Sequence, residues 1–138
     1  DPFDVLFLSD GRMAMCNIAG TTDDLRLYDA GGGSYTSLIS VTFPEQVSLT
    51  PSGTFLVASF TDDTISEVDD TGTLITQHNI GSSVRGVYLL GNGNWLATSS
   101  SDGVVEVDPA TGNVLSTKLS GGGWRFIEKA MVPSGIVP

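Results

Sequence analysis

The chain has 138 residues, with 16 acidic residues against 6 basic ones and a formal net charge of −10. This length corresponds to one domain, and so few Lys and Arg residues argue against nucleic acid or an anionic membrane surface as a partner. Hydrophobic residues make up 40% of the chain and charged residues 16%, with 17 glycines, which is typical of a turn-rich β protein rather than a disordered chain.

The first unit of the chain covers about residues 1–41 and contains four short apolar runs: "FDVLFL" at 3–8, "RMAMCNIA" at 12–19, "DDLRLYD" at 23–29 and "SYTSLIS" at 34–40. Short runs of this kind, closed by Gly, Pro, Asp or Asn, are typical of strands and turns. Cys16 is the only cysteine, so no internal disulfide can form. We expect its thiol to be buried and inert.

The next two units, about residues 42–82 and 83–121, repeat this pattern. The second holds "QVSLT", "TFLVASF", "TISEVD" and "TLITQH", and the third holds "RGVYLL", "NWLATSS", "GVVEVD" and "NVLSTKL". We therefore predict four strands in each unit. No window shows the sustained periodicity of a capped helix.

Three columns of the sequence recur with a period near 41 residues. Turn glycines stand at positions 11, 53, 93 and 135, strand-ending acids at Asp29, Asp69 and Asp108, and a Gly-bearing turn follows each acid. Four antiparallel strands repeated at this period are the pattern of β-propeller blades. The repeated columns Leu25/Ile65/Val104 and Phe7/Leu49/Leu89/Met131 are expected to be buried between blades.

The segment "VSLTPSGTFLVASFTDDTISEVDDTGTLI" resembles NHL-type and YVTN-type propeller repeats. The segment "GNGNWLATSSSDGVVEVDPATGNVL" is similar to repeats of arylsulfotransferase-like and quinoprotein-like propellers. The WD-type signature is absent. The resemblance implies the blade structure across nearly the whole chain, but such repeats occur in enzymes, binding modules and scaffolds alike.

Residues 122–138 remain after three blades, and "WRFIEKAM" at 124–131 takes the place of the first strand of a fourth. We therefore predict an all-β partial propeller of three four-stranded antiparallel blades plus that strand. Closed propellers have about four to eight blades, so this chain cannot close by itself. It is a segment of a longer propeller, a unit that associates with other copies, or an open stack. In each case its two end faces should contact further propeller blades.

Catalytic and metal-binding residues are scarce. There is one histidine, His78, and no G-x-S-x-G motif, so we assign no catalytic residue and no cofactor. The acid pairs Asp23–Asp24, Asp62–Asp63 and Asp69–Asp70 could suit calcium. They recur with the repeat, however, and are better explained as acceptors for their own turns. We assign no metal site.

A basic and aromatic group is the best candidate for a ligand site. Arg85 and Arg125 lie 40 residues apart, where the chain enters the first strand of a blade, which lines the channel in propellers. Arg can bind a carboxylate or sulfate through two hydrogen bonds, and Trp124 can stack on a ring or sugar. The alternative is that each Arg pairs with an acid of the neighbouring blade and that Trp124 packs between blades. His78 is a tentative further member, although it can equally be an exposed side chain on an outer strand.

Two functions remain open. The first is a non-catalytic, extracytoplasmic propeller segment that serves as a scaffold or binds a protein or glycan. The second is a fragment of a propeller enzyme, such as an arylsulfotransferase-like transferase, a lyase or a quinoprotein, whose catalytic residues lie in other blades. Low Lys content, many Ser, Thr and Gly residues and an acidic surface favour the first. No apolar run approaches the roughly 20 residues of a membrane span, so we expect no membrane insertion.

Overall fold

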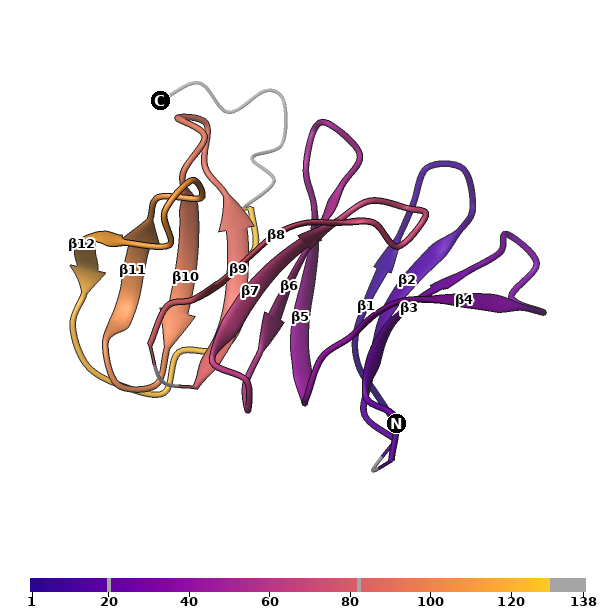
Figure 1. Ribbon diagram of the computed structural model, residues 1–138, viewed down its shortest axis with the longest axis horizontal. Helices are drawn as coiled ribbons and strands as arrows, with labels where there is room; N and C mark the ends of the chain where they lie inside the picture. The colour runs from indigo at the N-terminus through magenta and orange to yellow at the C-terminus, as the bar shows by residue number, and fades with distance from the viewer. Residues whose placement is uncertain (20, 82, 130–138) are drawn as a thin grey trace, which may run out of the picture.

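The computed structural model describes residues 1–19, 21–81 and 83–129, which form twelve strands and no helix. The strands make three four-stranded antiparallel sheets (Figure 1). Blade one contains β1 (Pro2–Phe7), β2 (Met13–Asn17), β3 (Asp24–Tyr28) and β4 (Tyr35–Ser40); blade two contains β5 (Pro44–Leu49), β6 (Phe55–Ser59), β7 (Thr64–Val68) and β8 (Leu74–Asn79); blade three contains β9 (Val84–Leu89), β10 (Trp95–Ser99), β11 (Gly103–Val107) and β12 (Val114–Leu119).

Each blade is a simple meander, because every strand pairs with the next one along the chain. The first strands of the blades, β1, β5 and β9, contact one another in that order and form the inner edge of the molecule. The three sheets stand side by side and do not close into a ring (Figure 1). The all-β, three-blade architecture predicted from the repeat is thus confirmed. In the described part of the chain, no helix is long and apolar enough to cross a membrane.

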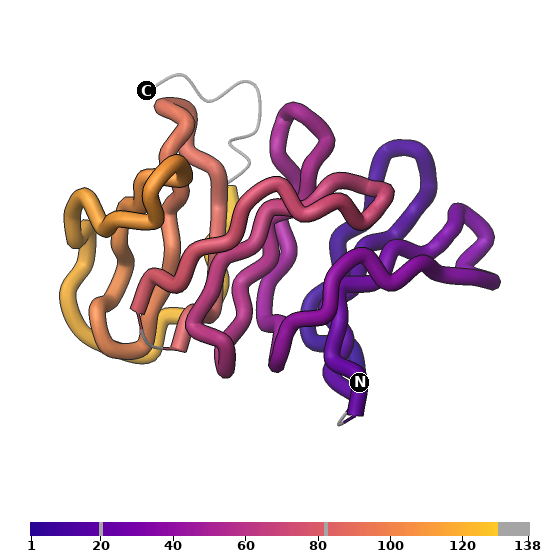
Figure 2. The backbone as a smooth tube through the Cα atoms, in the orientation of Figure 1, coloured from indigo at the N-terminus to yellow at the C-terminus, as the bar shows by residue number. Residues whose placement is uncertain are grey.

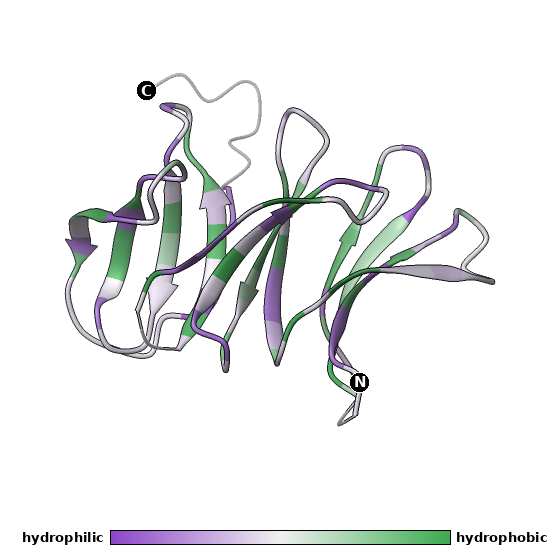
Figure 3. Ribbon diagram, viewed as in Figure 1, coloured by the Kyte–Doolittle hydropathy of each residue, from purple (hydrophilic) through white to green (hydrophobic). Residues whose placement is uncertain are grey.

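Two apolar clusters hold the blades together, one at each junction between them. Side chains alternate across a strand, so β2 and β3 direct Ala14, Cys16 and Leu25 toward blade two, where they meet Phe55 and Val57. The second cluster joins Leu56, Ala58 and Ile65 of blade two to Val87, Trp95, Val105 and Val107 of blade three. Apolar colouring in Figure 3 is accordingly concentrated on the strands rather than the turns.

One predicted buried column is confirmed at two of its three positions and the other is wrong. Leu25 and Ile65 are fully buried at the two junctions between blades, whereas Val104 is 9% exposed but lies on the face of blade three that has no neighbouring blade. In contrast, Phe7 is 77% exposed and Leu49 is 43% exposed, and Leu89 is half-buried. These side chains are exposed because of where they lie. Phe7 is on the face of blade one that has no neighbouring blade, and Leu49 borders an open cavity at the inner edge. Met131 lies outside the described residues.

Cys16 is fully buried and unpaired, as expected. Its burial raises the pKa of the thiol well above the ordinary value. A thiol that stays protonated is a poor nucleophile and metal ligand, so Cys16 acts as a small apolar residue in the junction between blades one and two.

The prediction of a strand over residues 124–131 is not met in residues 124–129, which form no strand; residues 130 and 131 lie outside the described part. After β12 the chain turns back along the lower end of blade three and rises behind β9 (Figure 2). It reaches the inner edge there, as the first strand of a further blade would, but without pairing to a strand.

The contacts of the acid that precedes the third strand differ in blade three. Before β5 and β9, Phe43 and Ser83 adopt positive φ angles of 57° and 56°, and their N–H groups donate to Asp23 and Asp63 of the preceding blade. The equivalent acid of blade three is Asp102, whose carboxylate accepts from the hydroxyl groups of Ser99 and Ser101. The residue equivalent to Phe43 and Ser83 is Gly123, which also has a positive φ, of 75°, but residues 124–129 after it form no strand.

Candidate functional site: the mouth of the inner strands

A β-bulge recurs at the same place in every inner strand. The pairing register skips one residue between Pro2 and Asp4, between Pro44 and Gln46, and between Val84 and Gly86. The residues left unpaired are Phe3, Glu45 and Arg85, and Arg125 follows 40 residues later. Bulges redirect side chains and often occur beside functional sites. Here they place one aromatic, one acidic and one basic side chain at one end of the inner edge.

Arg85 and Glu45 form a buried ion pair between blades two and three. Arg85 Nη1 lies 2.7 Å from Glu45 Oε1, and the Glu45 side chain is only 1% exposed. The Arg85 guanidinium also stacks over Phe60, 4.2 Å from the ring centre. Burial raises the pKa of Glu45, while the positive charges of Arg85 and Arg125 oppose that rise. Glu45 Oε2 has no hydrogen-bond partner among the described residues, so this carboxylate retains a free acceptor.

A series of aromatic rings extends from Phe60, which lies under Arg85. The rings of Phe3 and Phe43 lie 5.5 Å apart, those of Phe43 and Phe60 lie 5.6 Å apart, and Phe126 reaches Phe3 at 6.3 Å. These separations suit tilted aromatic packing. Phe126 is 48% exposed and therefore offers one face to solvent.

A second set of equivalent inner-strand residues links successive blades through hydrogen bonds between a side-chain oxygen of one blade and a backbone N–H of the next. Asp4 Oδ2 accepts from Val47 N at 2.9 Å, and Gln46 Oε1 accepts from Val87 N at 3.0 Å. The equivalent residue of β9 is Gly86, which offers no side-chain acceptor. The next backbone donor in the series, Ile127 N, instead donates to Gln46 at 3.2 Å. Gln46 thus serves two successive inner segments.

A cavity of about 290 Å³ opens beside this set of residues, lined in part by Asp4, Gln46, Ser48, Tyr88 and Lys129. Burial raises the pKa of Asp4, against the N–H groups of Val47 and Val5 that bind its carboxylate. Ser48 Oγ is buried without a hydrogen-bond partner among the described residues. The cavity therefore combines apolar walls with a few polar groups, as binding sites for small ligands and peptides do.

The structure brings together some of the residues that the sequence singled out. Arg85 and Arg125 both lie near Glu45, and the alternative prediction of an inter-blade ion pair holds for Arg85. Trp124 is 47% exposed, and its Nε1 donates to Gly121 O at 2.9 Å. His78 lies elsewhere, on the outer strand β8, where its ring contacts Trp95 and its Nε2 is 2.8 Å from Pro109 O.

Sequence reasoning missed Glu45, Gln46, Asp4 and Gly86. One available signal was the polar pair in "PEQVSL" at 44–49, within a run expected to be apolar. Aligning the four inner segments would have placed Glu45 in the column of Arg85 and Gln46 in that of Gly86. The contacts between these columns, however, depend on how the blades pack and are not visible in the sequence.

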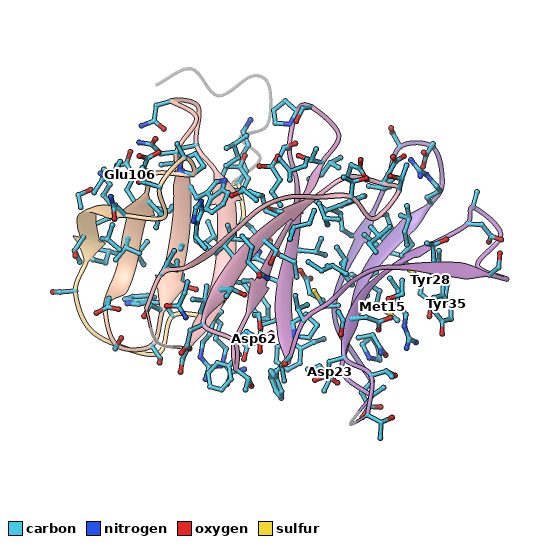
Figure 4. All side chains as sticks on the ribbon, in the orientation of Figure 1. Met15, Asp23, Tyr28, Tyr35, Asp62 and Glu106 are labelled. Carbon is cyan, nitrogen blue, oxygen red and sulfur yellow. The ribbon has the colours of Figure 1, made fainter. Side chains whose placement is uncertain are left out.

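The recurrent acids bind the backbone of the protein itself. Asp23 accepts from Ala19 N and Phe43 N, and Asp62 accepts from Thr42 N (Figure 4). At the later turn, Asp69 accepts from the N–H groups of Thr71 and Thr73. The described residues contain no group of three or more His, Cys, Asp or Glu side chains arranged to hold a metal ion. These contacts agree with a turn-forming role for the acids.

Comparison with known proteins identifies the fold. No model of a protein family matches the sequence, and a search of curated proteins finds no significant relative. Among solved structures, the hydrazine synthase of Kuenenia stuttgartiensis is 19% identical with a TM-score of 0.69, and the WD40 β-propeller domain of Doa1 is 21% identical with a TM-score of 0.66. XC5397 from Xanthomonas campestris, a gluconolactonase, is 14% identical with a TM-score of 0.66.

The alignments cover 91%, 83% and 91% of this chain but only 38%, 39% and 49% of those three structures. The chain thus spans less than half the length of these neighbours. They include enzymes as well as a WD40 domain, so the similarity defines the fold and leaves the activity open. The chain is a three-blade portion of the β-propeller fold.

Proposed function

We propose that this chain is a non-catalytic propeller segment that acts as a scaffold or binding module, and that its two end faces pack against further blades. Those blades belong to the same polypeptide or to another copy. The observation that carries the proposal is the uncovered face of blade one, which holds the side chains that the other two blades bury.

The face of blade one that points away from blade two holds Met13, Met15 and Tyr28, and Tyr35 lies beside them (Figure 4). In the repeat, Met13 corresponds to Phe55 and Trp95, both no more than 1% exposed because the preceding blade covers them. On blade one, Tyr35 is 51% exposed and Phe7 is 77% exposed. Large apolar and aromatic side chains left exposed together on one face favour an interaction site there.

The opposite end of the molecule is the free face of blade three, which is more polar. Glu106 lies there (Figure 4), where it pairs with Lys118 and accepts from Asn92 and Asn94. The free face of blade one carries Arg26, paired with Asp24 at 2.8 Å. Each end face therefore carries a paired acid and base, and the apolar side chains of blade one supply the main support for the interface.

The mouth of the inner strands is the proposed ligand site of the module, with Arg85, Trp124 and Arg125 as its basic and aromatic components. Support comes from the bulges that gather Glu45 and Arg85 and from the exposure of Trp124. The acidic, Lys-poor composition supports an extracytoplasmic location. Fractionation of cells that express the natural full-length protein tests that location, and recovery in the cytoplasm alone would contradict it.

End-face packing is tested by comparing two variants with the unaltered chain in sedimentation velocity. Met15→Glu places a charge in the face of blade one. Ile75→Glu is the matched control, because Ile75 is 52% exposed on the outer strand β8, away from both end faces. We expect Met15→Glu to weaken self-association or capture of added blades at least tenfold, while the control behaves like the unaltered chain. Equal behaviour of the two variants would contradict the proposed interface.

A further inference from the structure

Residues 125–129 are held against the inner strands by side chains that bind their backbone. The Gln46 carboxamide binds both backbone groups of Ile127: Nε2 donates to Ile127 O at 2.9 Å, and Oε1, which also accepts from Val87 N, accepts from Ile127 N at 3.2 Å. Thr98 Oγ1 donates to Arg125 O at 2.7 Å. Every residue except proline carries both of these backbone groups, so the contacts recognise the polypeptide backbone rather than particular side chains.

Gly86 makes room for the segment. A Cβ atom at position 86 would collide with the carbonyl oxygen of Arg125 and would lie 2.7 Å from Gln46 Oε1. Gln46 and Thr98 are 5% and 2% exposed, and both are fixed within strands of two different blades. The three residues form a preorganised cradle, which lowers the entropic cost of binding.

The charge around the cradle favours a basic segment. Residues 125–129 contain two of the six basic residues of the chain, Arg125 and Lys129. Arg125 lies near the buried Glu45, whose Oε2 has no partner among the described residues, and Lys129 lines the cavity that also contains Asp4. Glu128 is the exception, since its negative charge raises the pKa of Asp4.

We propose that the cradle of Gln46, Thr98 and Gly86, together with Glu45 and Asp4, is a binding site for an extended basic peptide of a partner protein, and that residues 125–129 occupy it in cis. This rests on the proposed function and refines its ligand site: Arg85 and Glu45 stay with the site, whereas Trp124 and Arg125 belong to the segment that occupies it in cis. Trp124 and Phe126 are 47% and 48% exposed, so the backbone and charge contacts, rather than deep burial of these rings, hold the segment in place.

The test uses the full chain and a fluorescent synthetic peptide of residues 122–129, followed by anisotropy. In the unaltered chain the tethered segment competes at an effective concentration of about millimolar, so the free peptide should bind weakly. Ile127→Pro removes the N–H that Gln46 binds and places a ring in its way, which vacates the cradle. We expect the peptide to bind Ile127→Pro at least tenfold more tightly than the unaltered chain.

Two controls separate the cradle from non-specific binding. Adding Thr98→Val or Gln46→Leu to Ile127→Pro should weaken peptide binding at least tenfold, as should replacing both Arg125 and Lys129 by Glu in the peptide. Equal binding to Ile127→Pro and the unaltered chain, or no effect of Gln46→Leu, overturns the proposal. If Ile127→Pro fails to fold, hydrogen exchange of the Ile127 N–H is measured instead, in the unaltered chain and in Gln46→Leu. Gln46→Leu must accelerate that exchange at least tenfold. No acceleration overturns the proposal.

These outcomes are distinguishable from failure of the proposed function. Peptide affinity is measured on the cradle at the inner edge, whereas sedimentation of the Met15→Glu variant reports on the end face of blade one. A chain that associates normally but binds no peptide overturns only the cradle. A chain that binds the peptide but remains a lone monomer overturns only the packing of the end faces.

Discussion

Replacing Trp95 with Ala should destabilise the protein by about 3 kcal/mol, because Trp95 fills the junction between blades two and three. Its side chain is fully buried and its ring lies 5.9 Å from that of His78. A buried Trp removes roughly 200 Å² from water, worth about 5 kcal/mol at about 25 cal/mol per Å². The Trp95 Nε1 group has no hydrogen-bond partner among the described residues, and loss of that unpaired donor offsets about 2 kcal/mol. The net value lies within the range of about 3–5 kcal/mol for core Trp→Ala changes.

Urea unfolding followed by circular dichroism measures this loss, at one fixed protein concentration because association also affects stability. With a slope of about 2 kcal/mol per M, the midpoint should fall by about 1.5 M. Trp124→Ala is the matched control, since Trp124 is 47% exposed, and it should change the free energy of unfolding by less than about 0.5 kcal/mol. A loss below about 1 kcal/mol at Trp95, or equal losses at both positions, would refute the packing of blade two on blade three.

Three further predictions concern charged groups. Arg85→Ala leaves the buried Glu45 carboxylate unpaired and should lower the free energy of unfolding, measured with urea, by about 3 kcal/mol. Adding Glu45→Gln should recover part of that loss. No recovery would argue against the ion pair. The Thr71 hydroxyl and Thr73 N–H lower the pKa of Asp69 from 3.8 to about 2, and Lys118, Asn94 and Asn92 lower that of Glu106 from 4.5 to about 2. Because the folded-state pKa values lie below the unfolded ones, this stabilisation is present above about pH 4.5 and is lost as the pH falls to about 2. The double change Asp69→Asn and Glu106→Gln should therefore flatten the pH dependence of the unfolding midpoint between these values. An unchanged slope would contradict the contacts of the two carboxylates. Treatment with a chelator should leave the thermal midpoint unchanged, and a fall of several degrees that calcium reverses would show that the recurrent acids bind metal.

The repeat made the blades predictable because each strand and turn is encoded locally. The turns at Asp29, Asp69 and Asp108 recur with their glycines, and the acids bind their own turn backbones. Burial at Leu25 and Ile65 followed from the same periodicity. Position within a repeat could not predict the exposure of Phe7, because burial there depends on whether a neighbouring blade is present.

The candidate site was only partly predictable, for a related reason. Arg85 and Arg125 stood out as bases at one position of the repeat, and Arg85 does pair with an acid of the neighbouring blade. Glu45 and Gln46 act across blades, through distances that arise only once the sheets are packed. The effect of Gly86 is likewise visible only when the backbone of residue 125 is seen against it. His78 was grouped with this site from the sequence alone. It lies on the outer strand β8, where it contacts Pro109 of blade three instead.

The uncovered end faces of the open three-blade arc are the central feature of the proposed assembly. Light scattering of residues 1–138 across a range of micromolar concentrations measures the mass of the assembly directly. We predict a mass above the 14.4 kDa of a single chain, or loss of the circular dichroism spectrum of the folded state at concentrations where the chain is monomeric. A folded, monodisperse species of 14.4 kDa at every concentration would contradict this prediction.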